Sequence, residues 1–199
     1  MQLLAKDLVV DRAGRRIINK LSFAVSSGET LLLTGRNGAG KTTLIRTLAG
    51  YLTPMEGSIS LQGFTEDRDQ REACHYIGHL NADKASLTVL ENLRFWQRYL
   101  GGGTIPASSD EAREKLWAAL ERFAIDPLAD IPAGYLSAGQ KRRLGLARLL
   151  VAYRPLWLLD EPTVSLDVQS TGLLAGVIES HLATGGLVVA ATHLPLGLA

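Results

Sequence analysis

This chain of 199 residues contains little cysteine and almost no excess of one charge over the other. Cys74 is the single cysteine, which excludes an internal disulfide and fits a reducing compartment. Lysine and arginine number 21 against 20 aspartate and glutamate residues, so the net charge is close to zero. This balance argues against a nucleic-acid partner held by a basic surface.

Long apolar runs are missing as well. No run approaches the ~20 residues that a membrane-spanning helix requires. The N-terminal segment carries Asp7 early and has no long apolar core, so it is not expected to be a signal peptide. No internal repeat or low-complexity segment is present either, and the chain length suits one compact domain with a sizeable core.

A glycine-rich segment at residues 35–42 fits the phosphate-binding pattern G-x-x-x-x-G-K-[ST]. Residues 30–34 before it predict a buried strand, and residues 42–49 after it predict a helix that ends at Gly50. Glycines let backbone N–H groups reach phosphate oxygens, and the helix N-terminus adds partial positive charge. Lys41 is expected to reach the β- and γ-phosphates of a nucleotide. The predicted binding residues are Gly35, Arg36, Asn37, Gly38, Ala39, Gly40, Lys41, Thr42 and Thr43.

Two adjacent acids end a second apolar run. Residues 156–159 are too few for a helix and are typical of a fully buried parallel strand. Asp160 is expected to hold Mg²⁺ together with the Thr42 hydroxyl, either directly or through water. Glu161 is the better candidate to orient and activate an attacking water. Solvated acids at a strand end are a common alternative, but an unfavoured one behind a phosphate-binding loop.

The remaining pattern predicts an α/β fold. Alternation within residues 1–33 and at 58–61 predicts antiparallel strands, and residues 88–123 read as helical, with breaks at 101–103 and Pro106. A helix at about 168–183 and a strand at 187–191 follow the acids. His193 then lies at a strand's carboxyl end, where doubly wound sheets place ligands. We expect one domain over residues 1–199, with a helical subdomain at about 85–150.

The segment Leu-Ser-Ala-Gly-Gln at residues 136–140 precedes a helix predicted at 144–152. Ser137 is the expected N-cap, which leaves backbone donors and a helix dipole at that end. Spacing alone predicts an anion site without identifying its ligand. Residues 141–143, Lys-Arg-Arg, are interpreted as a solvated face of the helix rather than a phosphate patch.

This segment resembles the signature motif of ATP-binding cassette (ABC) ATPases, which usually reads LSGGQ. Residues 160–163 are similar to the Walker B region of that family, residues 165–167 to its D-loop and residues 192–193 to its H-loop. The resemblance covers essentially the whole chain. It implies a P-loop ABC nucleotide-binding domain with a mainly parallel sheet core, an N-terminal antiparallel β subdomain and a helical insert.

The resemblance also implies a mechanism with ATP and Mg²⁺ shared between two copies stacked head to tail. ATP on one P-loop would be closed over by the partner's signature segment, with Glu161 polarising water and His193 contacting the γ-phosphate. Phosphoryl transfer needs charge stabilisation on both sides of that phosphate. The signature residues that would bind it are Ser137, Ala138, Gly139 and Gln140. Integral membrane subunits are the implied partners, with this chain peripheral at the cytoplasmic face of the inner membrane.

Two positions depart from the family pattern. The glutamine expected after residues 76–79 is replaced by Leu80 and Asn81, and whether Asn81 takes its role is open. No aromatic residue for stacking on adenine occurs near residues 11–14. Arg12 could lay its guanidinium on the base, or the adenine is held loosely.

Several stretches resemble more narrowly the ATPase subunits of the haem-handling complexes of c-type cytochrome biogenesis. They are the LSAGQ variant and residues 76–79, 87–96 and 188–196. The resemblance implies that ATP hydrolysis powers haem release or delivery. The alternatives are an ABC ATPase subunit for another cargo and an ATP-dependent switch outside transport. The intact Lys41, Asp160, Glu161 and His193 argue against a cassette that has lost turnover.

Overall fold

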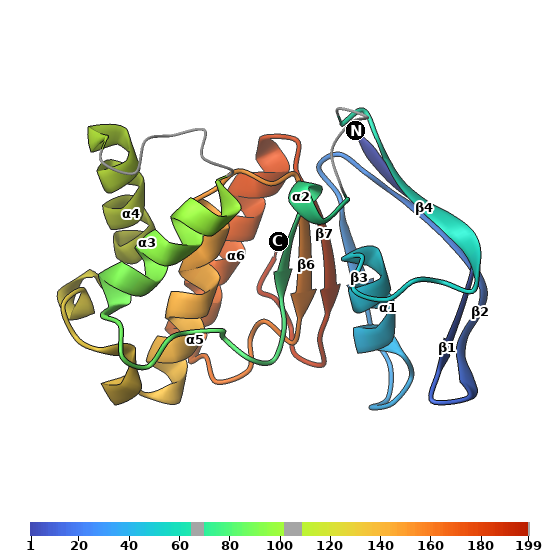
Figure 1. Ribbon diagram of the computed structural model, residues 1–199, viewed down its shortest axis with the longest axis horizontal. Helices are drawn as coiled ribbons and strands as arrows, with labels where there is room; N and C mark the ends of the chain where they lie inside the picture. The colour runs from blue at the N-terminus through green and yellow to red at the C-terminus, as the bar shows by residue number, and fades with distance from the viewer. Residues whose placement is uncertain (65–69, 102–108, 199) are drawn as a thin grey trace. The chain divides into compact units, whose positions relative to one another are not determined.

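The computed structural model describes residues 1–64, 70–101 and 109–198 (Figure 1). The chain forms two compact units. The first unit contains residues Met1–Gly78, Arg154–Pro162 and Ile178–Pro195, and the second contains His79–Tyr153, Thr163–Val177 and Leu196–Ala199. The helical unit therefore includes the predicted subdomain at 85–150, while one domain over the whole chain stays a prediction.

An antiparallel sheet opens the first unit, as the alternating sequence predicts. Strands β1 (Gln2–Arg12), β2 (Arg15–Ser26) and β4 (Glu56–Gln62) lie in the order β2-β1-β4. The β1–β2 turn passes through Ala13 and Gly14, both at positive φ. Such a left-handed pair is the geometry of a tight hairpin turn. The N-terminal β prediction is confirmed.

A parallel sheet forms the other layer of the first unit. Its strands are β3 (Thr30–Leu33), β7 (Leu187–Ala191), β6 (Leu156–Asp160) and β5 (Cys74–Ile77), in the order β3-β7-β6-β5. All residues of β6 and β7 are buried, as expected for continuous apolar strands with both faces covered. Helix α1 (Lys41–Leu48) contributes Leu44, Ile45 and Leu48 to one core with both sheets. The short helix α2 (Gln70–Ala73) was not predicted, because a single turn has no readable periodicity.

The second unit is helical. It contains α3 (Val89–Leu100), α4 (Asp110–Arg122), α5 (Ala138–Ala147) and the first part of α6 (Val168–Ala183). Short 3₁₀ turns lie at Asp126–Leu128, Ala133–Tyr135 and Arg148–Leu150. Gly101 ends α3 as its C-cap, whereas the rest of the predicted break, including Pro106, lies outside the described residues.

One helix boundary differs clearly from the prediction. The helix expected at residues 144–152 starts at Ala138 and ends at Ala147, with a 3₁₀ turn after it. The basic residues 141–143 hide the apolar periodicity of its first turns. The helix begins there because Ser137 caps it: its Oγ accepts from the Gln140 backbone N–H, while Gln140 Oε1 accepts from the Ser137 N–H. This reciprocal pair is a capping box.

Candidate nucleotide site and signature segment

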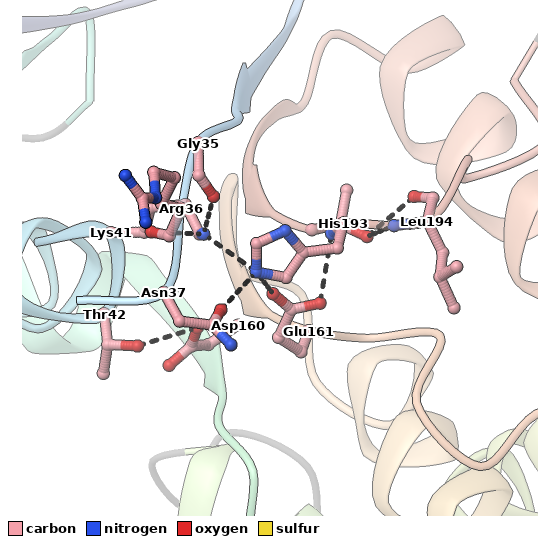
Figure 2. Close-up of polar contacts among 10 residues, drawn as sticks. Gly35, Arg36, Asn37, Lys41, Thr42, Asp160, Glu161, His193 and Leu194 are labelled. Atoms are coloured by element: carbon pink, nitrogen blue, oxygen red, sulfur yellow. Dashed lines mark hydrogen bonds and ion pairs between the residues drawn. The ribbon is translucent and has the colours of Figure 1, made fainter. Parts of the chain in front are cut away.

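The predicted phosphate-binding loop joins β3 to α1 in the first unit (Figure 2). Gly35, Gly38 and Gly40 all have positive φ, between 81° and 135°. Gly40 is the N-cap of α1 and supplies no side-chain capping bond. The first backbone N–H groups of α1 therefore face outward without a cap, which is the arrangement that binds anions.

Gly40 also has a packing reason to be glycine. A Cβ atom at this position would lie 2.8 Å from Ile17 Cγ2 on β2. The hairpin of β1 and β2 thus reaches the phosphate-binding loop through Ile17. Arg12 lies beside the turn of that hairpin, exposed and paired in register with Arg15. Among the residues that the structure describes, nothing tests whether Arg12 stacks on adenine, so that role stays a prediction.

Lys41 directs its ammonium group into the loop. Its Nζ atom donates to the carbonyl oxygen of Gly35 at 2.6 Å and lies 3.4 Å from that of Arg36. A third contact, of 3.0 Å, joins Nζ to His193 Nε2. Phosphate oxygens are stronger acceptors for an ammonium group than these carbonyl and imidazole atoms. The lysine is thus held where a phosphate would take over its hydrogen bonds.

Thr42 and Asp160 come together from α1 and the end of β6. The Thr42 hydroxyl donates to Asp160 Oδ1 at 3.1 Å, and Asp160 is only 1% exposed. A hydroxyl and a carboxylate oxygen are hard ligands of the kind Mg²⁺ takes beside nucleotide phosphates. The donor set of this pair fits the predicted metal role.

Glu161 and His193 face each other across the ends of β6 and β7 (Figure 2). Glu161 has φ 50°, an uncommon left-handed conformation for a residue other than glycine. Its backbone N–H donates to Ala191 O at 2.8 Å, and its Oε2 accepts from the His193 N–H at 3.3 Å. The parallel pairing of β6 and β7 therefore holds both residues at one edge of the sheet, and strained backbone of this kind recurs at active sites.

The His193 ring lies among both hydrogen-bond donors and hydrogen-bond acceptors. Nε2 is 2.6 Å from Asn37 Oδ1 and 3.4 Å from Glu161 Oε1, both of which accept, whereas Lys41 Nζ donates. A single ring nitrogen satisfies either the lysine or the oxygens, depending on the tautomer. His193 thus connects the phosphate-binding loop to the acid at the strand end.

Three other predicted residues of the loop have local structural positions: Thr43, Arg36 and Ala39. Thr43 is 5% exposed in the first turn of α1, so its side chain is buried. Arg36 and Ala39 form a turn, in which the Ala39 N–H donates to Arg36 O at 3.2 Å.

The signature segment belongs to the second unit. Its capping box engages the side chains of Ser137 and Gln140 within the segment itself. A Cβ atom at Gly139 would lie 2.9 Å from Ser165 O, so the segment 163–167 packs tightly against this glycine. Position 138 already carries a methyl group as alanine. A Cβ atom is therefore accommodated at position 138 but not at position 139 without a shift of the neighbouring backbone.

The segment 163–167 leads into α6. The Ser170 N–H donates to Asp167 Oδ1 at 2.7 Å, which caps the helix start. The side-chain and backbone hydrogen bonds of Ser170 hold the pKa of Asp167 below its ordinary value. The aspartate of the predicted D-loop thus serves as a helix cap in this chain.

The interpretation of residues 141–143 as a solvated face is wrong for Arg142. Arg142 is 3% exposed and donates to Asn81 Oδ1 at 3.2 Å. Arg143 donates to the carbonyl oxygens of Phe123 and Ala124 at 3.1 and 2.9 Å. A run of charges read in sequence does not reveal these partners, because they lie between 19 and 61 positions away along the chain.

The glycine-rich loop, the acid pair and the capped LSAGQ helix are each consistent with what comparison with known families finds. The model of the family described as ABC transporter matches residues 18–164. This chain belongs to the ABC transporter family.

Individual relatives agree over the full length of this ABC ATPase. A protein of Rhizobium meliloti (strain 1021), named cytochrome c biogenesis ATP-binding export protein CcmA, is 50% identical over 200 residues, covering 100% of this chain and 94% of that protein. The protein of the same name from Rhodopseudomonas palustris (strain HaA2) is 48% identical over 198 residues, with coverages of 100% and 94%. A solved structure, an ATP-binding subunit of an ABC transporter, matches with a TM-score of 0.84 at 26% identity, covering 98% of this chain and 80% of that one.

These comparisons confirm the predicted family and fold class, as well as the predicted enzyme class. The ABC ATPase is an ATP-binding, ATP-hydrolysing subunit of an ABC transporter. Within residues 1–64, 70–101 and 109–198, no helix combines the length and apolar character needed to cross a membrane.

Proposed function

We propose that this subunit powers the haem-handling transporter of c-type cytochrome biogenesis. The observation that carries the proposal is the 50% identity, over all of this chain, to a protein named as the ATP-binding export protein of that process. The proposed partners are integral membrane subunits resembling CcmB and CcmC, and the proposed location is the cytoplasmic face of the inner membrane. Residues 1–199 would act there as one ATPase domain.

The nucleotide site would work through contacts that already exist. Lys41 would exchange Gly35 O and His193 Nε2 for phosphate oxygens of ATP, and the freed His193 would turn its ring to the γ-phosphate. Thr42 and Asp160 would hold Mg²⁺, which offsets phosphate charge when bound. Glu161, held by the backbone of Ala191 and His193, would accept the proton of the attacking water.

We further propose that the site is completed by a second copy in a head-to-tail pair. The loop and the Glu161–His193 pair supply donors and a base from one copy. The capped N-terminus of α5, with Ser137, Ala138, Gly139 and Gln140, would bring backbone N–H groups and a helix dipole to the opposite side of the γ-phosphate. No nucleic acid is part of the proposal, because the chain carries almost no net charge.

Glu161→Gln tests the shared site. Removing the base should reduce turnover by about 10²–10⁴-fold. Binding of ATP should persist and trap a dimer, which size-exclusion chromatography with and without ATP would detect. A variant that stays monomeric with ATP, or that hydrolyses ATP at the normal rate, would overturn the shared site. Purification of the tagged chain from membranes would test the cargo assignment, since membrane subunits of another transporter would contradict it.

A further inference from the structure

Two buried arginines lie on the signature helix and the turn that follows it. Arg142 on α5 is 3% exposed, and Arg148 at the start of the next 3₁₀ turn is 6% exposed. A buried guanidinium is costly unless its N–H groups are hydrogen-bonded. The groups that receive these hydrogen bonds are therefore part of what fixes the position of α5.

Asn81 meets both arginines. Its side-chain Oδ1 accepts from Arg142 Nη1 at 3.2 Å, and its backbone oxygen lies 3.5 Å from Arg148 Nη1. A Cβ atom at Gly145, between the two arginines on the helix, would come within 3.2 Å of Asn81 Cβ and Oδ1. The backbone of α5 thus approaches Asn81 closely, and Asn81 packs against the face of this helix that carries Arg142 and Gly145.

The same contacts continue into α3. The Arg148 guanidinium lies 4.8 Å from the centre of the Trp96 ring, in cation–π geometry. Trp96 in turn packs edge-on against Phe95 and Tyr99, which are 37% and 70% exposed. Asn81 therefore belongs to a connected set that joins the loop after β5, the signature helix and an exposed aromatic face of α3.

From this geometry we infer that Asn81 is a positioning residue for the signature helix, acting through Arg142. The inference rests on the proposed head-to-tail site, in which the N-terminus of α5 must meet ATP held by the partner copy. Ligation of Mg²⁺ by Asn81 is the competing role. Its Oδ1 already accepts a hydrogen bond from a cation, so a metal ion there would be set against the Arg142 guanidinium.

The test uses the Glu161→Gln chain as its background. Asn81→Ala added to it should raise the ATP concentration for half-maximal dimerisation by at least about tenfold, because Arg142 loses a hydrogen-bond acceptor that helps to orient it. Binding of a fluorescent ATP analogue to the monomer, at low protein concentration, should change less than about twofold, since the phosphate-binding loop is untouched. Asn81→Asp should restore dimerisation, because it keeps an acceptor of the same length for Arg142.

A matched pair on α5 sharpens the result. Arg142→Met should reproduce the defect of Asn81→Ala, and the two together should cost little more than either alone. Lys141→Met removes the same charge from the neighbouring position and should leave dimerisation near that of the background.

Three outcomes are decisive. Normal dimerisation of folded Asn81→Ala, judged by its thermal unfolding, would overturn the positioning role. A rise in the Mg²⁺ concentration that the monomer requires to bind ATP, reversed by Asn81→Asp, would overturn it in favour of metal ligation. Failure of Glu161→Gln alone to dimerise would overturn the shared site itself, and with it this role of Asn81.

Discussion

The nucleotide loop and the signature segment use their polar side chains in opposite ways. At the loop, His193 contacts Lys41, Asn37 and Glu161, so these bonds can be exchanged for bonds to a ligand. In the signature segment, Ser137 and Gln140 satisfy each other, and the segment can offer mainly its backbone and its shape. The difference indicates that the loop offers side chains that can bind a ligand, whereas the signature segment offers backbone groups held in a fixed position.

The largest effect is expected from Lys41→Ala. Loss of the ammonium group removes charge-assisted hydrogen bonds to the phosphates, so ATP affinity should fall by at least about tenfold, or 1.4 kcal/mol. Isothermal titration with ATP and Mg²⁺ would measure it. Lys6→Ala, at an exposed position of the same unit, should leave affinity unchanged. Equal affinities for wild type and Lys41→Ala would break the comparison, because the loop would then not depend on its reactive group.

In the signature segment the expected effect is on stability rather than on ATP affinity. Gly139→Ala would place a Cβ atom 2.9 Å from Ser165 O, a backbone atom that must shift to admit it. We expect the free energy of unfolding to fall by about 1–3 kcal/mol. Chemical denaturation would measure this loss.

Ala138→Gly is the matched control for that substitution. It removes a methyl group from the neighbouring position and should cost only about 0.5–1 kcal/mol, through backbone entropy. Monomeric ATP binding should be kept in both variants. If the control proved the more damaging change, fixed geometry would not explain why glycine stands at position 139.

The smallest effect concerns pH and a histidine that belongs to neither region. His181 stacks on Trp157 with 3.8 Å between ring centres, and its Nε2–H donates to Pro155 O at 3.1 Å. Burial lowers the pKa of His181. The unfolded chain therefore binds the proton more tightly, so stability is full above the ordinary histidine pKa of about 6.5 and falls as pH drops toward the folded value. Thermal unfolding across this window measures it.

A control for that titration is His181→Gln. It removes the titrating group and should flatten the slope of stability against pH between neutral and mildly acidic conditions. An unchanged slope in this variant would assign the pH dependence to other groups. Turnover is expected to respond little, since His181 contacts neither the loop nor the signature segment within the described residues.

Local sequence patterns predicted much of this structure. The buried strands β6 and β7, helix α6 and the N-terminal hairpin follow from periodicity, and the motif around Lys41 follows from spacing. The N-cap of α5 at Ser137 follows from its residue type and is confirmed, whereas the helical turns at residues 138–143 did not follow from periodicity, because charged residues interrupt the apolar pattern. The burial of Arg142 did not either, since its acceptor Asn81 is 61 positions away in the chain.

The sequence by itself determined the chemical inventory: the glycines of the loop, the lysine, the acid pair, the histidine and the serine-led helix. Each depends on neighbours within a few residues, where backbone sterics and hydrogen bonding act directly. Only the tertiary structure decided that His193 lies between Lys41 and Glu161 and that Asn81 accepts a hydrogen bond from Arg142. Those contacts depend on parallel strand pairing and helix packing between distant segments, which no local pattern encodes.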